Sequence, residues 1–145
     1  MATLFQGTIK YDKLGDDGLQ KTVSEKYLFD AESYTEAEAV LTEQMAPFIS
    51  GHFEIADIKK QNIAEVFIGN YDDADKWYVV KIAIITIDEK TAKEKRTAYR
   101  YYQQAASLEL AVDDFTKNMY GTCSDWQLLS VSETPIVDYF KRDEQ

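Results

Sequence analysis

Cysteine, histidine, proline and glycine are all scarce in this chain of 145 residues. Cys123 is its only cysteine, so the chain forms no intramolecular disulfide and no thiolate zinc cluster, which is typical of a reducing compartment. The six glycines are scattered, which excludes the glycine loops that bind phosphates and dinucleotides. No segment approaches about 18 apolar residues, and no basic segment followed by an apolar run opens the chain. We therefore expect a soluble, cytoplasmic protein without a membrane partner.

The remaining composition is that of a folded protein. Hydrophobic residues make up 45% of the chain and aromatic residues 13%, too many for a disordered segment. A chain of this length is long enough to bury a core and fits one domain, so residues 1–145 are predicted to form a single domain.

Acidic residues dominate, and the formal net charge of −10 argues against nonspecific adhesion to nucleic acid or to an anionic membrane. The charge is unevenly distributed. The window from Lys76 to Arg100 carries +4, which leaves −14 for the rest of the chain. Such a window is compatible with an anionic ligand held at one place. It is equally typical of a solvated hairpin whose lysines and arginines block edge pairing.

The second half of the chain repeats the first. Residues 21–45 match residues 95–119 at a shift of 74 positions, and the match continues at a shift of 73 after one residue is lost. The first stretch has these identities: Lys21/Lys95, Tyr27/Tyr101, Ala31/Ala105, Ser33/Ser107, Ala37/Ala111, Thr42/Thr116 and Met45/Met119. The second has these similar pairs: Phe53/Trp126, Ile55/Leu128, Ile58/Val131, Ile63/Ile136, Glu65/Asp138 and Phe67/Phe140.

Each repeat has the pattern of two strands, a helix and a strand. In the first, the turn residues Asp16–Gly18 separate the two strands, and Ser33 with Glu36 has the spacing of a capping box. The strand that follows the helix is either one long strand or two strands bent near Gln61 and Asn62. We expect strands at 4–11, 21–29, 53–58, 63–68, 77–87, 95–104, 126–131 and 136–140, and helices at about 34–45 and after Ser107.

The predicted fold class is α+β, an internally duplicated strand-strand-helix-strand unit. Repeat 1 covers about 4–68, repeat 2 covers about 76–140, residues 69–75 join them, and residues 141–145 form a frayed tail. We expect one mainly antiparallel sheet with both helices on one face and the strand at 77–87 in its middle. Neither half is expected to fold alone.

Five segments of the chain form a recognisable series. They are Phe48–Gly51, Ile58–Lys60, Ala74–Tyr78, Ile85–Thr91 and Glu133–Ile136. Taken in this order, they resemble a domain-of-unknown-function family, number 4494, from gut Bacteroidales and their phages. The resemblance covers nearly the whole chain and implies a bacterial or phage cytoplasmic protein. It carries over no catalytic residue.

Few residues offer catalytic chemistry. Cys123 and His52 lie in equivalent loops after the two helices, where a dyad is conceivable, although a loop histidine and a half-buried cysteine explain both. The acidic groups at 16–17 and 72–75 lack the calcium-loop pattern and fit solvated turns. We therefore predict no catalytic residue, no metal, no cofactor and no enzymatic activity.

The best candidate surface is the hairpin of the second repeat. At the two-residue period of a strand, Arg96, Arg100 and Tyr102 share one face, where arginines can hold phosphates while a base stacks on the ring. Alternatively, the tyrosines pack under the helices and the arginines pair with acids. We predict a small accessory protein that binds single-stranded DNA or RNA through Lys59, Lys60, Lys81, Lys95, Arg96, Arg100 and Tyr102. The rival hypothesis is a protein-interaction or assembly module, including self-association, that docks a partner through aromatics or a free strand edge.

Overall fold

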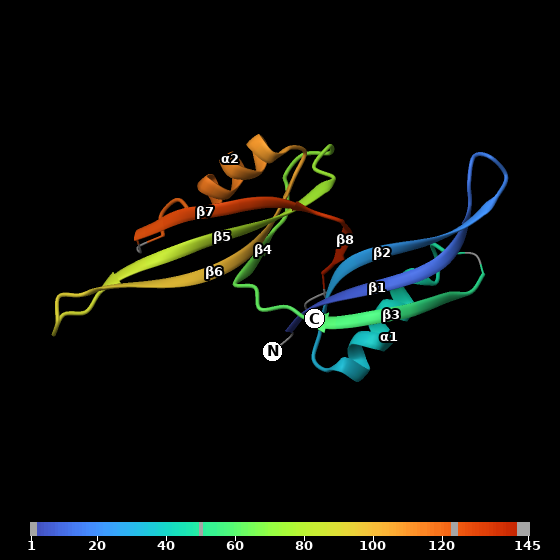
Figure 1. Ribbon diagram of the computed structural model, residues 1–145, viewed down its shortest axis with the longest axis horizontal. Coiled ribbons are helices and arrows are strands. Elements are labelled where there is room, and N and C mark those ends of the chain that lie inside the picture. Colours follow the sequence, from blue (N-terminus) through green and yellow to red (C-terminus); the bar gives the residue numbers. More distant parts are fainter. Residues whose placement is uncertain (1–2, 50, 123–124, 142–145) are drawn as a thin grey trace. The chain divides into compact units, whose positions relative to one another are not determined.

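Two four-stranded sheets, each packed against one helix, make up the computed structural model, which describes residues 3–49, 51–122 and 125–141 (Figure 1). Both helices and both hairpins lie where the sequence predicts them, and the predicted bend near Gln61 separates two strands. The elements are β1 (Thr3–Leu14), β2 (Gln20–Ala31), α1 (Tyr34–Met45), β3 (Phe53–Lys60), β4 (Glu65–Phe67), β5 (Lys76–Ile87), β6 (Glu94–Ala105), α2 (Leu108–Asn118), β7 (Asp125–Thr134) and β8 (Ile136–Phe140).

The prediction of one sheet covered by two helices is wrong. One sheet has the strand order β3-β1-β2-β8, and the other has the order β7-β5-β6-β4. Each contains two antiparallel pairs and one parallel pair, so both sheets are mixed. Strands β3 and β8 flank the first hairpin and strands β4 and β7 flank the second. Each hairpin therefore already has a neighbour on both sides, and the two hairpins do not pair with one another.

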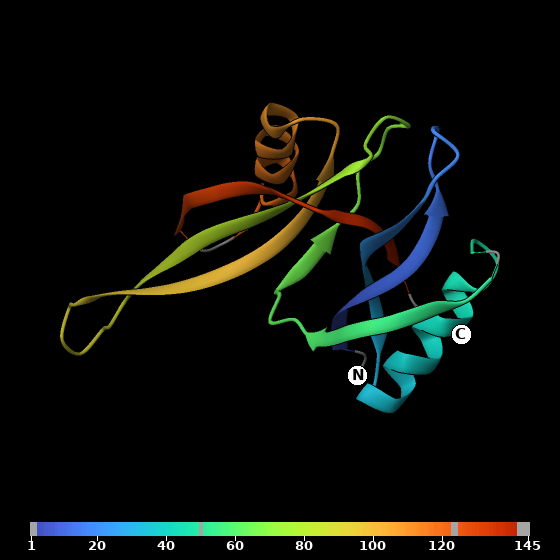
Figure 2. The ribbon, with the colours of Figure 1, turned by 45° about the vertical axis from the view of Figure 1, so that its right-hand side comes forward.

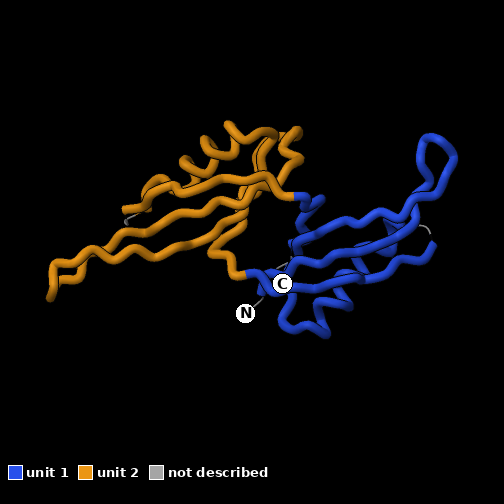
Figure 3. The backbone as a smooth tube through the Cα atoms, viewed as in Figure 1, with its two compact units in different colours: residues 1–61, 135–145 blue, residues 62–134 orange. Residues whose placement is uncertain are grey.

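The chain forms two compact units whose boundaries differ from those of the predicted repeats. Unit 1 contains residues 1–61 and 135–145, and unit 2 contains residues 62–134 (Figure 3). Strand β4 follows β3 in the sequence but pairs with β6 in unit 2. Strand β8 follows β7 but pairs with β2 in unit 1. The prediction of a single domain stays a prediction, and of the expected frayed tail, residues 142–145 lie outside the described residues.

The core of unit 1 lies between α1 and its sheet. Phe5 and Phe29 stack at 6.0 Å between ring centroids, and both are almost fully buried beside Leu41 of the helix. Gly7 allows this close approach, because a Cβ atom at that position would lie 2.4 Å from Cδ2 of Leu41. The face of α1 that carries Ala37, Leu41 and Met45 is thus the buried one, as its helical period predicts.

Unit 2 has its core between α2 and the β5–β6 hairpin. Its cluster combines Val80 and Ile82 of β5 with Tyr101 of β6 and Phe115 of the helix. Figures 1 and 2 both show α2 lying along one face of this sheet. The other face of the hairpin is therefore turned away from α2.

Side-chain caps start both helices where the sequence predicts them. The Ser33 hydroxyl accepts a hydrogen bond from the backbone N–H of Glu36 at 3.1 Å, and Ser107 accepts one from Leu110 at 3.2 Å. Glu36 points back and accepts from the backbone N–H of Glu32 at 3.4 Å, one residue earlier than in a standard capping box.

Replacing Ser33 with alanine is expected to lower the free energy of unfolding by about 1 kcal/mol, because the backbone N–H of Glu36 loses its side-chain acceptor at the start of α1. Urea unfolding followed by circular dichroism measures the change. Ser24→Ala, an exposed serine of β2, is the matched control and is expected to have little effect. Equal stability of the two variants would contradict the capping role of Ser33.

The β5–β6 hairpin is longer than the strands beside it. Its register runs from Lys76 opposite Ala105 to Ile87 opposite Glu94, whereas β7 stops opposite Ile85. Figure 2 shows the two strands continuing as a ribbon past the ends of β4 and β7. A tight turn closes the ribbon, with the backbone N–H of Asp88 donating to the carbonyl of Lys93 at 2.9 Å.

Neither of the two described helices has the length and apolar character that crossing a membrane requires.

Candidate nucleic-acid interface

Side chains of the β5–β6 hairpin alternate between a face under α2 and a face turned away from it, which we call the outer face. Val80, Ile82 and Tyr101 point toward the helix and join its core. Their neighbours Lys81 and Arg100 point the other way, because successive residues of a strand face opposite sides. Arg96 and Tyr102 alternate in step with Arg100, so these three residues lie on the outer face of β6.

Three polar residues form a row across the outer face, which we call the cationic row. Lys81 lies directly opposite Arg100 on β6 and directly opposite Ser130 on β7. All three side chains are exposed, and no ion pair to either cation is found within the described part of the chain. Like charges that face each other across two strands are destabilising unless an anion lies between them. The row is thus suited to an anionic ligand.

The corresponding row in unit 1 is electrically balanced. Thr8 lies opposite Lys26 on β2, the residue before the repeated tyrosine Tyr27, and opposite Asp57 on β3. One cation and one carboxylate replace the two cations of unit 2. The Asp57 carboxylate also lies 3.6 Å from the ammonium group of Lys59. Only unit 2 therefore presents an uncompensated positive row at this position.

Arg96 continues the outer face toward the tip of the hairpin, and its guanidinium group already has partners. It donates a hydrogen bond to the side-chain oxygen of Gln127 on β7. It also lies 3.6 Å from the carboxylate of Glu94. Both partners hold the side chain against the sheet, so Arg96 is less available to a ligand than Arg100 is.

Lys95 does not join the cationic row. It is exposed, but it lies on the α2 side of β6 because it alternates with Arg96 and pairs with Thr86. Lys59 and Lys60 are exposed residues of β3 in unit 1, whereas the hairpin belongs to unit 2, so their part in a common surface stays a prediction.

Tyr102 is buried, with only 3% of its surface exposed. Burial raises the pKa of its hydroxyl, and the nearby charge of Arg100 lowers it. The ring therefore presents no free face on which a base could stack. Tyr99 is 40% exposed, but it points toward the α2 side of the hairpin, opposite Ile82. Among the residues that the structure describes, neither Tyr102 nor Tyr99 therefore presents an exposed ring beside the cationic row.

Sequence reasoning missed the contribution of β7 to this face, namely Ser130 and Gln127. The register between β5 and β7 shifts beside Lys81, where Leu129 is an extra residue in the ladder. The only signal in the sequence is the pair Leu128 and Leu129, which interrupts the alternation of the strand. A bulge of this kind redirects side chains and is common beside functional sites.

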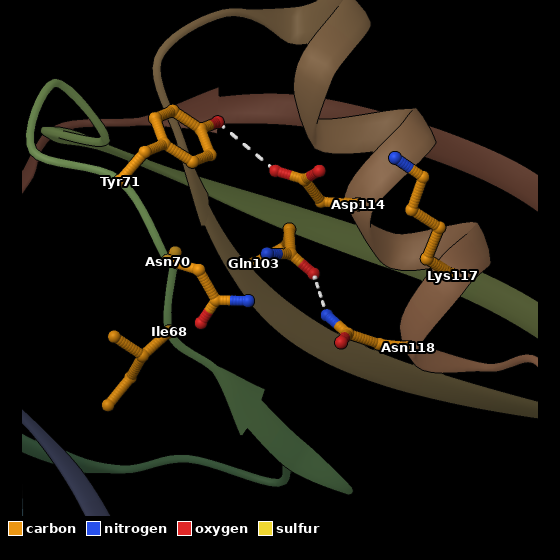
Figure 4. A pocket seen from close by; sticks show the side chains of 8 residues that line it. Ile68, Asn70, Tyr71, Gln103, Asp114, Lys117 and Asn118 are labelled. Carbon is orange, nitrogen blue, oxygen red and sulfur yellow. Dashed lines mark hydrogen bonds between the residues drawn. The ribbon is translucent and has the colours of Figure 1, made fainter.

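A small polar cavity of about 80 Å³ lies elsewhere in unit 2, between α2, β6 and the loop after β4 (Figure 4). The Tyr71 hydroxyl donates to the Asp114 carboxylate at 3.1 Å and accepts from the backbone N–H of Ala106. The amide of Asn118 donates to the fully buried Gln103 at 2.9 Å. Both hydrogen bonds drawn in Figure 4 join two residues of the cavity wall to each other. The space holds a few water molecules at most, far less than the roughly 300 Å³ of a ligand pocket.

The other predicted sites have ordinary structural roles or lie outside the described residues. Asp17 accepts a hydrogen bond from the backbone N–H of Leu19 at 3.1 Å, as the turn interpretation predicts. No group of three acidic, histidine or cysteine side chains that could hold a metal is found in the described ranges. Cys123 is not among the described residues, so the dyad with His52 stays a hypothesis.

Comparison with known proteins identifies one family. The model of the family described as Domain of unknown function (DUF4494) matches residues 3–142, which is nearly the whole chain. No curated protein and no solved structure matches the chain.

Proposed function

Because the chain belongs to the DUF4494 family, whose description assigns no activity, we propose a function from the geometry of the hairpin. The protein is a small non-enzymatic accessory protein that binds single-stranded DNA or RNA through the outer face of β5 and β6. The observation that carries this proposal is the cationic row, in which Lys81 and Arg100 face each other and neither forms an ion pair with any residue that the structure describes.

A phosphate group matches the chemistry of the row. Directly opposite residues have Cβ atoms roughly 5 Å apart, so one phosphate can contact both cations. The planar fork of Arg100 suits two phosphate oxygens, Lys81 adds a point charge, and the Ser130 hydroxyl adds a donor. A bound phosphate would also remove the repulsion between the two cations, which gives binding a favourable term that a neutral ligand lacks.

The acidic charge of the rest of the chain favours a single-stranded nucleic acid over a double-stranded one as the ligand. That part carries −14 and repels polyanions everywhere except at the hairpin. A duplex brings a higher density of phosphates to that body than a single strand does. Since Tyr102 is buried, contacts are made mainly to phosphates, and little preference for base sequence is expected.

Fluorescence polarisation with short labelled oligonucleotides tests the proposal. Binding is expected at low salt and is expected to weaken as salt rises. The double variant Lys81→Gln with Arg100→Gln removes two phosphate contacts. The plot of log affinity against log salt concentration should therefore become shallower, its negative slope decreasing in magnitude by about 1.4. Lys10→Gln with Lys13→Gln removes the same charge from exposed positions of β1 and is the matched control. No binding at low salt, or equal losses in both double variants, would overturn the proposal.

A second candidate function is a protein-interaction or assembly module, and the edge of β6 favours it. On the side away from β5, β6 pairs with β4 only at Tyr101–Gln103, so residues 94–99 have no strand partner on that side among the described residues. Lys95 and Arg96 lie on this edge, and charged side chains oppose strand addition there. The nucleic-acid proposal is therefore preferred, and association with a protein in place of oligonucleotide binding would reverse the preference.

We also propose that the chain arose by internal duplication, that it comes from a bacterium or a phage, and that it is located in the cytoplasm. Corresponding strand orders in the two sheets support the duplication. So do the two repeated tyrosines, Tyr27 and Tyr101, which lie opposite the acidic residues Asp138 and Glu65 in parallel pairs.

A further inference from the structure

Each sheet contains one strand that follows the strands of the other unit in the sequence. Strand β8 comes after the strands of unit 2 yet completes the sheet of unit 1, and β4 comes after the strands of unit 1 yet completes the sheet of unit 2 (Figure 3). Both added strands are parallel to the strand that receives them. Each sheet thus has a strand-receiving edge, on β2 in unit 1 and on β6 in unit 2.

The two receiving edges select strands of the same chemistry. On β2, Tyr27 lies opposite Asp138, and its ring stacks on Phe140 at 5.4 Å with an interplanar angle of 17°. The equivalent tyrosine of β6 lies opposite Glu65 and stacks on Phe67 at 5.7 Å and 5°. Burial is the main cause of the raised pKa of both tyrosine hydroxyls. The charge of Glu65 is the next cause for Tyr101, whereas Asp138 contributes less to Tyr27 than Glu25 does. Both edges therefore accept a strand of the pattern acidic residue, any residue, phenylalanine.

The middle residue of the added strand distinguishes the two edges. In β8 it is Tyr139, whose hydroxyl donates to the Asp30 carboxylate at 2.7 Å. In β4 it is Val66, which has no side-chain donor. The ends of β4 are held by two further bonds, from the Ala64 N–H to the Arg100 carbonyl and from the Gly69 N–H to the Gln104 side chain. The chain just before β8 is fixed as well, since the Thr134 hydroxyl donates to the carbonyl of Trp77 at 2.8 Å.

The connection to β8 is short and stiff. Pro135 alone separates β7 from β8. A proline fixes its own φ and pushes the preceding residue, Thr134, toward extended conformations. Short, constrained hinges of this kind favour exchange of the following element between molecules.

We infer that the β2 edge recognises β8 of a second copy of this chain, so that two copies exchange their β8 strands and form a closed, symmetric dimer. The exchanged dimer keeps every contact of β8 described above and differs from the monomer only at the hinge. Association therefore needs no additional interface.

Refolding the full chain at high and at low protein concentration tests this inference, with light scattering after size-exclusion chromatography as the readout. A dimer is expected after refolding at high concentration and is expected to persist on dilution, because separation requires β8 to detach. Inserting Gly-Ser-Gly-Ser after Pro135 relaxes the hinge and should shift the product to monomer. The same insertion between Asp72 and Asp73 is the control and should leave the dimer fraction unchanged.

Mixed refolding locates the exchanged strand. Isotopically heavy and light chains are refolded together and cross-linked through lysines, and Lys26 of β2 and Lys141 after β8 report on their pairing. Cross-links that join a heavy chain to a light chain between these positions support the exchange. Monomer under all conditions, or a dimer whose β2–β8 cross-links stay within one chain, would overturn it.

Discussion

Replacing Phe115 with alanine is expected to lower the free energy of unfolding by about 3–5 kcal/mol, the range for a fully buried phenylalanine. The ring belongs to α2 and has only 1% of its surface exposed. It meets three aromatic rings edge to face or nearly so: Phe67 at 5.9 Å, Tyr101 at 5.3 Å and Trp126 at 5.7 Å. These rings come from β4, β6 and β7, so the substitution opens a cavity where the helix meets three strands.

Urea unfolding monitored by tryptophan fluorescence measures the loss, since Trp126 is in contact with the replaced ring. Leu110→Ala on the same helix is the control, because Leu110 is 40% exposed and is expected to cost much less. A loss of under about 1 kcal/mol for the Phe115 variant would show that the aromatic cluster is not the centre of the unit 2 core.

Alkaline pH is expected to destabilise the protein steeply. Burial, then the charge of Glu25, raises the pKa of Tyr27 far above its ordinary value of 10.0. Burial and a hydrogen bond to Asp30 raise the pKa of Tyr139 in the same direction. The unfolded chain loses these protons first as pH rises, so the stabilisation is complete below the ordinary value and is lost progressively above it. Burial also raises the pKa of Tyr11, Tyr71, Tyr78, Tyr101 and Tyr102.

All seven shifts have the same direction, so the free energy of unfolding is expected to fall continuously as the pH rises above 10.0. Urea unfolding on both sides of pH 10 measures the fall, and tyrosine absorbance identifies the ionisation. Tyr139→Phe removes one of the shifted groups and should make the fall with pH shallower. An unfolding free energy that stays constant above the ordinary tyrosine pKa would contradict the burial of these hydroxyls.

Local sequence signals were sufficient to predict the elements of the fold. The bounds of α1 follow from Ser33, Glu36 and the helical spacing of Ala37, Leu41 and Met45, all within a few turns of one another. The hairpins follow from turn residues between alternating strands. In each case the local structure is determined by residues that are close in the sequence, so it can be predicted from the sequence pattern alone.

The partners of β4 and β8 could not be predicted, because their pairing is not local. The bend near Gln61 was visible in the sequence, but nothing in the bend indicates which sheet the next strand joins. The same limit affects the candidate interface. Strand alternation placed Arg96, Arg100 and Tyr102 on one face. The position of Lys81 opposite Arg100, the burial of Tyr102 and the arrival of Ser130 depend on more distant parts of the chain.

The order of β8 in the sequence has a consequence during synthesis on the ribosome. The edge of β2 at Lys26–Phe29 stays without its parallel neighbour until residues 136–140 have been translated, long after the rest of unit 1 has emerged. The complete sheet of unit 2, in contrast, needs nothing made later than β7. Unit 2 is thus made as one continuous stretch, whereas the first-made strands of unit 1 wait for the last-made strand of the chain. A nascent chain stalled just before Ile136 would expose Tyr27 and its neighbours to chaperones or proteases.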